Sequence, residues 1–274
     1  MKEEKAILAV SFGTSHEDTR KKTIDKIEEE IAKSFPECRL YRAWTSKVII
    51  RILKNREGIE IDGVEEAMQR MKADKIRKVI IQPTHIINGI EYELMKEEAK
   101  KHMHEFESIC FGAPLLNADE DYEAVVEIFA KLKKEWEKAP DEGRKEGKKK
   151  RAYLLMGHGS SHYANAAYAA LDYRFKDKGL EDFFVGTVEA YPGIENIIKK
   201  LKASGYERAL LFPLMIVAGD HAKEDMAGED PSSWKSILQE NRIEAEAILM
   251  GLGEIEEIRT LLLSHIRKAG QGLI

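Results

Sequence analysis

The sequence predicts an α/β protein built from two similar halves, each with a mainly parallel sheet flanked by helices. Three observations lead to this prediction: short apolar runs alternate with longer amphipathic stretches, motifs of the first half recur in the second, and a dense run of charge separates the two. Parallel neighbouring strands need crossover connections, which the amphipathic stretches supply as helices. We therefore expect an N-terminal half over residues 1–140, a charged linker over 141–151 and a C-terminal half over 152–274.

Eight apolar runs are predicted to be strands, four in each half. In chain order they are AILAVSF (6–12), CRLYRAW (38–44), KVIIQPT (78–84), SICFGAP (108–114), AYLLMG (152–157), FFVGTVEA (183–190), ALLFPLMI (209–216) and EAILMG (246–251). The stretches between them are predicted helices, the clearest being 15–35 and 119–139. In the first of these, Ile24, Ile27 and Ile31 recur at intervals of three and four residues, the spacing of one helix face.

An internal repeat relates the two halves. SFGTSH (11–16) and GHGSSH (157–162) each follow a predicted strand and open a helix. PTHIINGIEYELM (83–95) and PLMIVAGDHAKEDM (213–226) share the end of a strand, a proline, and a glycine six residues later. This alignment matches Phe12 with His158 and Glu91 with His221, so the imidazoles are kept in the second half only.

Composition excludes several classes of protein. Hydrophobic residues at 43% and charged residues at 34% are typical of a globular chain, and a net charge of -5 argues against a nucleic-acid partner. The two cysteines, Cys38 and Cys110, lie far apart, which excludes a cysteine-built metal centre and fits a reducing compartment. No apolar stretch reaches membrane-spanning length, so we expect a cytoplasmic protein without a membrane partner. The oligomeric state stays open, a homo-oligomer included.

Three residues at predicted strand ends suggest a metal centre. His158, Glu189 and His221 each lie at or beyond the carboxyl end of a strand, where the loops of open α/β sheets converge on ligands. Two imidazoles and one carboxylate suit Co²⁺, Ni²⁺, Fe²⁺ or Zn²⁺ and leave coordination positions open. Each residue also has a structural explanation: His158 as a hydrogen-bonding residue, Glu189 as a cap of the helix near Gly193, and His221 as a capping or surface residue. The coincidence of all three favours the metal centre.

Other polar groups allow alternative interpretations. His85 is as compatible with a local hydrogen bond as with ligand binding, and we expect His102, His104 and His265 to lie on the surface. The turns at 13–15 and 159–161 could present backbone N–H groups to an anion. No nucleotide-binding glycine motif is present, so no nucleotide cofactor is expected.

Several motifs together resemble one family. These are VSFGTSHEDT (10–19), TSKVIIRIL (45–53), HIINGIEYE (85–93), MGHGSSH (156–162), VEAYPG (188–193), PLMIVAGDHAKEDM (213–226) and GLGE (251–254). They are similar to the anaerobic cobalt chelatases of cobalamin biosynthesis, the CbiK type, from Ala6 to about Lys268. The resemblance implies a two-domain chelatase fold, shared with protoporphyrin ferrochelatase, with the active-site cleft between the domains. It also implies a metal-chelatase lyase that inserts Co²⁺ into sirohydrochlorin, or precorrin-2, without ATP.

The resemblance also assigns roles to residues. His158 and His221 correspond to the metal-binding histidines, Glu189 to their carboxylate partner and Glu91 to the acidic residue of the NGxEYE motif. From the chemistry of metal insertion we further expect His158 to accept pyrrole protons, with Glu91 assisting. Arg42 and Arg51 are candidates for binding the eight carboxylates of the substrate. The other expected substrate contacts are Phe12, Gly13, Thr14, His85, Gly159 and Ser160.

Metal selectivity cannot come from such a ligand set, so Fe²⁺ and Ni²⁺ are expected to be accepted as well. Two alternatives therefore remain: a ferro- or nickel-chelatase acting on sirohydrochlorin, and a non-catalytic carrier of metal or tetrapyrrole.

Overall fold

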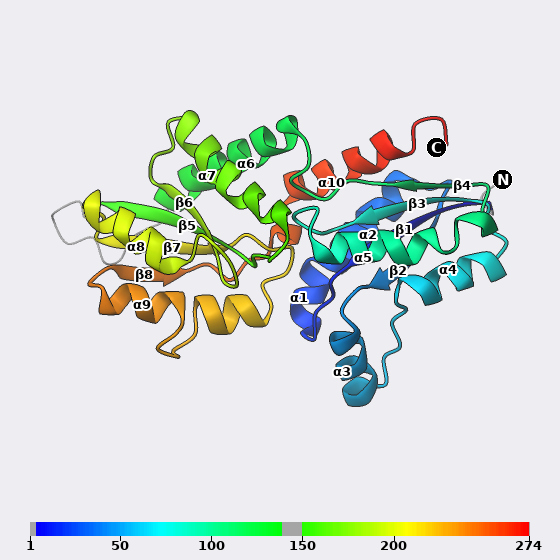
Figure 1. Ribbon diagram of the computed structural model, residues 1–274, viewed down its shortest axis with the longest axis horizontal. Helices are drawn as coiled ribbons and strands as arrows, with labels where there is room; N and C mark the ends of the chain where they lie inside the picture. The colour runs from blue at the N-terminus through cyan, green and yellow to red at the C-terminus, as the bar shows by residue number, and fades with distance from the viewer. Residues whose placement is uncertain (1–3, 139–149, 274) are drawn as a thin grey trace. The chain divides into compact units, whose positions relative to one another are not determined.

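The computed structural model describes residues 4–138 and 150–273 and shows two four-stranded parallel sheets flanked by helices (Figure 1). The sheets have the strand orders β2-β1-β3-β4 and β6-β5-β7-β8, which are the same order in the two halves of the chain. The predicted α/β class and the internal repeat are thereby confirmed. Within the described residues, no helix combines the length and the apolar composition that a membrane crossing requires.

The first sheet lies in a compact unit made of residues 1–117 and 253–274. Its strands are β1 (Lys5–Ser11), β2 (Arg39–Trp44), β3 (Lys78–Pro83) and β4 (Ser108–Phe111). Its helices are α1 (Glu17–Lys22), α2 (Ile24–Ser34), α3 (Lys47–Glu57), α4 (Val64–Ala73), α5 (Ile90–Lys100), the short η1 (Met103–Glu105) and α10 (Glu256–Ala269). The central strand β1 is buried along nearly its whole length, as expected for a parallel strand covered on both faces.

The second sheet lies in a compact unit made of residues 118–252. Its strands are β5 (Arg151–Gly157), β6 (Phe183–Thr187), β7 (Arg208–Pro213) and β8 (Glu244–Ala247). Its helices are α6 (Asp119–Lys138), α7 (Ala166–Asp177), α8 (Ile194–Ala203), α9 (Trp234–Glu240), the short η2 (Tyr163–Asn165) and the π-helix η3 (His221–Met226). A last short helix, η4 (Leu252–Glu254), lies where the chain returns to the first unit.

The units do not coincide with the halves 1–140 and 152–274 that the sequence suggested. Helix α6 packs into the second unit, where Phe129 contacts the rings of Phe175 and Phe212. Helix α10 returns to the first unit, where Arg259 pairs with Glu30 of α2 at 2.6 Å. Each helix follows one sheet in sequence but buries its apolar face on the other, which strand–helix alternation alone cannot reveal. Of the predicted linker 141–151, residues 141–149 lie outside the described residues, and Arg151 already begins β5.

Three local predictions were also wrong. The single helix expected over 15–35 is interrupted at Thr23, which adopts φ -121 and ψ -82, although its N–H still donates to the carbonyl of Thr19 at 3.1 Å. The last strand starts at Glu244, ahead of the apolar run at 246–251, because this edge strand alternates exposed glutamates with half-buried alanines. His265 is buried, and its Nδ1 lies 3.1 Å from the carbonyl of Ala113.

Candidate metal centre

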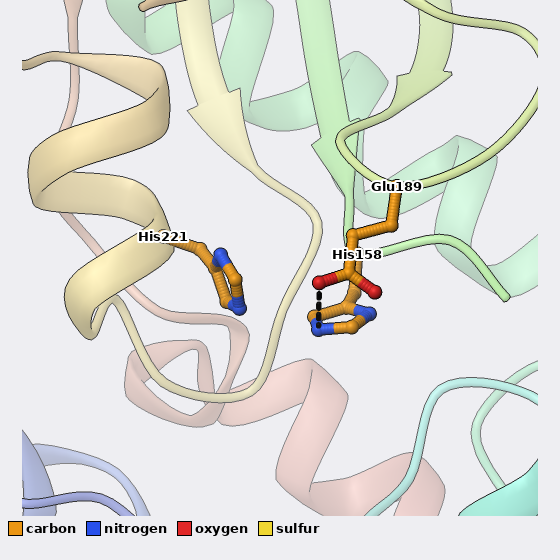
Figure 2. Close-up of side chains that lie close together, drawn as sticks. All are labelled: His158, Glu189 and His221. Atoms are coloured by element: carbon orange, nitrogen blue, oxygen red, sulfur yellow. Dashed lines mark ion pairs between the residues drawn. The ribbon is translucent and has the colours of Figure 1, made fainter. Parts of the chain in front are cut away.

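Three side chains converge at the carboxyl end of the second sheet. His158 directly follows β5, Glu189 lies two residues beyond β6, and His221 is the first residue of the π-helix after β7. Because β5 lies between β6 and β7, the three strand ends are neighbours. Each residue offers one ligand atom, and these atoms all lie within 4.8 Å of one another (Figure 2). The structure thus brings together the three residues that the sequence singled out.

Hydrogen bonds fix which ring nitrogen of each histidine is free. His158 Nδ1 lies 2.9 Å from the carbonyl oxygen of Gly159, and His221 Nδ1 lies 2.6 Å from Oδ2 of Asp225. A carbonyl and a carboxylate can only accept, so Nδ1 carries the proton in both rings and Nε2 keeps its lone pair. His158 Nε2 lies 3.7 Å from Oε1 of Glu189, and the ring centroids of His158 and His221 are 4.6 Å apart. Both imidazoles therefore present a metal-binding nitrogen to the same small volume.

The cluster is open to solvent. The side chains of His158, Glu189 and His221 are 39%, 56% and 37% exposed, so water can reach an ion held there. Three protein ligands with room for water are typical of catalytic sites, whereas structural sites close a full ligand shell with protein atoms. The arrangement is compatible with both binding and release of an ion.

Backbone geometry places Glu189 beside His158. The ladder between β5 and β6 continues past both strands, with Val188 N–H donating to Gly157 at 3.0 Å and Glu189 N–H donating to His158 at 2.9 Å. Gly159 then turns with φ +90, and a Cβ there would lie 2.9 Å from the backbone nitrogen of Ala190. A glycine after His158 is needed for both the conformation and the close approach.

The structure does not support the capping role considered for Glu189. Gly193 is the N-cap of α8, Asn196 Oδ1 accepts from its N–H at 3.1 Å, and no bond from Glu189 to this helix is present among the described residues. The histidine that does cap a helix is His162, whose Nδ1 accepts from Ala164 N–H at the start of η2. Glu189 is therefore left with its carboxylate facing His158.

Known proteins place the chain in a family. The family model described as cobalt chelatase (CbiK) matches residues 5–271. The sirohydrochlorin cobaltochelatase of Salmonella typhimurium is 40% identical over 265 residues, which cover 97% of this chain and 96% of that protein. The chain belongs to the cobalt chelatase family.

A second relative and two solved structures agree with this placement. The sirohydrochlorin cobaltochelatase CbiKC of Nitratidesulfovibrio vulgaris is 32% identical, covering 98% of this chain and 92% of that protein. The sirohydrochlorin chelatase SirB from Bacillus subtilis subspecies spizizenii, solved in complex with cobalt, has a TM-score of 0.61 at 10% identity and covers 98% of this chain and 97% of its own. SirB from Bacillus subtilis with Fe³⁺ has a TM-score of 0.63 at 13% identity, covering 98% of both chains. At these identities the two structures show a shared fold.

Residues of the first glycine turn are placed as follows. Phe12 follows β1 and is exposed, which leaves its ring available to a ligand. Gly13 adopts φ +100 against the indole of Trp44, and the buried hydroxyl of Thr14 accepts from His16 N–H at 3.2 Å. Gly13 and Thr14 thus have structural roles in shaping the turn, and their contact with substrate stays a prediction.

His85 and Glu91 also belong to the first unit. His85 is only partly exposed, and both of its ring nitrogens are buried without a hydrogen-bond partner among the residues that the structure describes. Burial lowers the pKa of His85 to about 4, so the ring is neutral near pH 7. Glu91 lies in the first turn of α5 and is partly buried. Their roles toward substrate and protons stay predictions.

The second glycine turn uses its N–H groups internally. The backbone N–H of Gly159 donates to the hydroxyl of Tyr168, and the N–H of Ser160 donates to Oδ1 of Asn165 at 3.0 Å. The Ser160 hydroxyl accepts from His162 N–H at 3.1 Å. Two of the N–H groups expected to bind substrate carboxylates at 159–161 are therefore already occupied.

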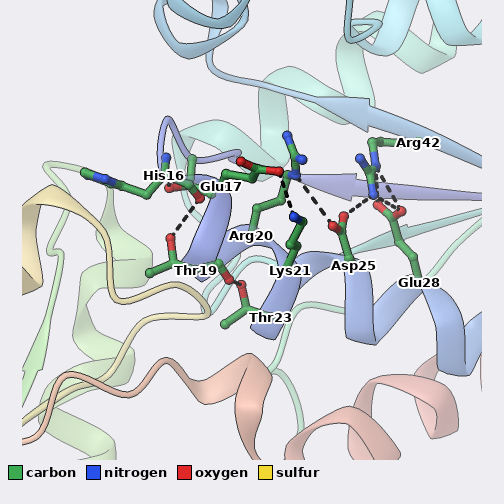
Figure 3. Close-up of polar contacts among 10 residues, drawn as sticks. His16, Glu17, Thr19, Arg20, Lys21, Thr23, Asp25, Glu28 and Arg42 are labelled. Atoms are coloured by element: carbon green, nitrogen blue, oxygen red, sulfur yellow. Dashed lines mark hydrogen bonds and ion pairs between the residues drawn. The ribbon is translucent and has the colours of Figure 1, made fainter. Parts of the chain in front are cut away.

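The two candidate arginines differ in availability. Arg42 on β2 is held by two carboxylates of α2, because its Nε lies 2.9 Å from both carboxylate oxygens of Glu28 and its Nη2 contacts Asp25 (Figure 3). Its charge is neutralised inside the fold, where it fastens α2 to the sheet. Arg51 on α3 is exposed, beside exposed Val48, and has no ion-pair partner within the described part of the chain. Arg51 is the better candidate for a substrate carboxylate.

Sequence reasoning missed two residues that contact the His158, Glu189 and His221 cluster or its loops. Asp225 lies four residues after His221, and that spacing on one helix face is a signal that could have identified it. Asn165 bonds to two different loops, and no local pattern indicates this.

Proposed function

We propose that this member of the cobalt chelatase family inserts Co²⁺ into sirohydrochlorin, without ATP, as a step of anaerobic cobalamin biosynthesis. The observation that carries the proposal is the convergence of His158, Glu189 and His221 in a chain that is 40% identical to a sirohydrochlorin cobaltochelatase over 97% of its length. Precorrin-2 is the alternative macrocycle, because it differs from sirohydrochlorin only in oxidation state.

The two imidazoles and the carboxylate bind the incoming ion. Nitrogen and oxygen ligands of this kind suit a borderline divalent metal, and the remaining positions hold exchangeable water. A site with three protein ligands can hand its ion to the four nitrogens of a macrocycle, since each protein bond can be replaced in turn. A closed four-ligand site would instead retain the metal.

Insertion also releases two pyrrole protons, and the same residues can accept them. While an ion is bound, the Nε2 lone pair of His158 is occupied; once the ion moves into the macrocycle, that nitrogen can accept a proton. Glu189 is freed in the same step. We assign the first proton to His158, with Glu91 assisting as a proposal that the sequence motif supports.

The protein residues do not select cobalt by affinity. Nickel, copper and often zinc bind nitrogen and oxygen ligands as strongly as cobalt, or more so. We therefore propose that the purified chain also accepts Fe²⁺ and Ni²⁺ in vitro and that metal supply decides the product in the cell. A dedicated ferro- or nickel-chelatase is the corresponding alternative. The two free cysteines fit a reducing cytoplasm, which is where we place the reaction.

Initial rates of metal insertion test this proposal. Under anaerobic conditions, sirohydrochlorin and protoporphyrin are each mixed with Co²⁺, Fe²⁺ or Ni²⁺, with and without the protein. We expect acceleration for sirohydrochlorin with Co²⁺ and a slower reaction with the other two ions. A protein that binds Co²⁺ but leaves the insertion rate at its spontaneous value would be a carrier, and the proposed function would be wrong.

A further inference from the structure

Asn165 connects the two loops that carry His158 and Glu189. Its Oδ1 accepts from the backbone N–H of Ser160 at 3.0 Å, and its Nδ2 donates to the backbone carbonyl of Tyr191 at 2.6 Å. Asn165 stands at the N-cap position of α7, where an asparagine side chain ordinarily caps the helix, but it makes no such bond here. Both ends of its amide are used to join two loops instead.

The two bonded positions are related to the metal ligands in the same way. Ser160 lies two residues after His158, and Tyr191 lies two residues after Glu189. The backbone bonds from Val188 and Glu189 to the β5 side mark the end of the ladder between the two strands. Asn165 adds a bridge between the two loops beyond that end.

A second contact joins the loop that carries His158 to the loop that carries Glu189. Gly159 lies so close to Ala190 that a Cβ on the glycine would meet the Ala190 nitrogen at 2.9 Å. The loops are therefore both packed against each other at Gly159 and Ala190 and tied together by Asn165. The same two loops carry His158 and Glu189, whose Nε2 and Oε1 atoms lie 3.7 Å apart.

We infer that Asn165 is a positioning residue of the metal centre, which sets the spacing between His158 and Glu189 without touching the ion. The inference rests on the proposed function in that Co²⁺ is the ion bound. Outer residues that orient metal ligands typically contribute 10- to 100-fold to metal affinity. Because Asn165 is partly exposed and acts through the backbone, we expect the lower end of that range.

The test is Co²⁺ binding by anaerobic titration calorimetry on the full chain, with matched variants. Asn165→Ala removes both bonds. Asn165→Asp keeps the acceptor for Ser160 but turns a carboxylate oxygen toward the Tyr191 carbonyl. Asn241→Ala is the control, since Asn241 also accepts one bond, from Lys202, and donates one, to Ile237, but does so at the end of α9.

We expect both Asn165 variants to raise the Kd for Co²⁺ about tenfold, with a parallel rise in the KM for Co²⁺ and an unchanged KM for sirohydrochlorin. The thermal midpoint of the metal-free protein should fall no further than in Asn241→Ala. A wild-type Kd in Asn165→Asp would overturn the inference, as would an equal weakening in Asn241→Ala. If Asn165→Ala does not fold, the isosteric Asn165→Asp decides the question alone.

The same measurements separate this inference from the proposed function. A wild-type chain that binds Co²⁺ without inserting it would remove the function, while the Kd values would still test Asn165. A wild-type chain that inserts cobalt, with unchanged Kd values in the variants, would remove only the role of Asn165.

Discussion

The buried imidazole of His85 makes the stability of the first unit depend on pH. Both ring nitrogens are out of contact with water and lack a partner among the described residues, and this burial lowers the pKa to about 4 from a usual 6.5. Because the folded pKa lies below the unfolded one, the unfolded chain takes up the proton first. The contribution to stability is therefore complete above pH 6.5 and is lost as the pH falls toward 4.

The size of the effect follows from the two pKa values. The gap between 6.5 and about 4 corresponds to about 3 kcal/mol once the pH is below both, and about 2 kcal/mol is already lost at pH 5. His85→Met should remove this dependence, because methionine cannot titrate and occupies the matching position, Met215, in the second half of the chain. It also removes a buried polar group whose lack of a hydrogen bond costs about 1–3 kcal/mol.

Urea unfolding at pH 7.5 and pH 5.0 measures the difference, with His104→Gln as a control that removes an exposed histidine. We expect wild type and the control to lose about 2 kcal/mol more than His85→Met between the two pH values. An NMR titration of the His85 ring gives its pKa directly. A value near 6.5, or equal acid sensitivity in all three proteins, would refute the reasoning.

Three further predictions concern the site. Asp225→Ala should raise the Kd for Co²⁺ 10- to 100-fold in calorimetry, because the His221 ring loses the carboxylate that fixes its tautomer; an unchanged Kd would contradict this. Gly159→Ala should weaken Co²⁺ binding at least as much, since φ +90 and the contact with the neighbouring loop both exclude a side chain; wild-type binding would show that the loops can shift without cost. Arg51→Gln should raise the KM for sirohydrochlorin in initial-rate assays and leave the KM for Co²⁺ unchanged. Arg42→Gln should instead lower the thermal midpoint, because Arg42 is paired with Asp25 and Glu28. The reverse pattern would make Arg42 the substrate contact.

The architecture was predictable because its signals are local and repeated. Each buried parallel strand is a short apolar run, and the two sheets use the same motif order, so one half supports the interpretation of the other. The exchange of α6 and α10 between the units was not predictable, because an amphipathic helix shows that it packs but not on which sheet. The break at Thr23 lies in the backbone angles of a single residue, which apolar spacing does not record.

The candidate metal ligands were accessible to the same reasoning for a simple topological reason. Residues that follow parallel strands share one edge of the sheet, so His158, Glu189 and His221 could be placed together without knowing any distance. Supporting residues are different, since Asn165 acts through backbone atoms of two loops that only the folded chain brings together. Arg42 shows the opposite case: its residue type suggested a ligand, while its surroundings use the charge within the fold.

Cobalt insertion as proposed requires His158 and His221 to act on one ion, and anaerobic spectrophotometry of sirohydrochlorin with Co²⁺ tests this directly. Wild type, His158→Ala and His221→Ala are compared with His104→Ala, which removes an exposed histidine far along the sequence from either ligand. The account predicts that cobalt insertion falls toward the spontaneous rate in both site variants and is unchanged in the control. Wild-type rates in either site variant would contradict it.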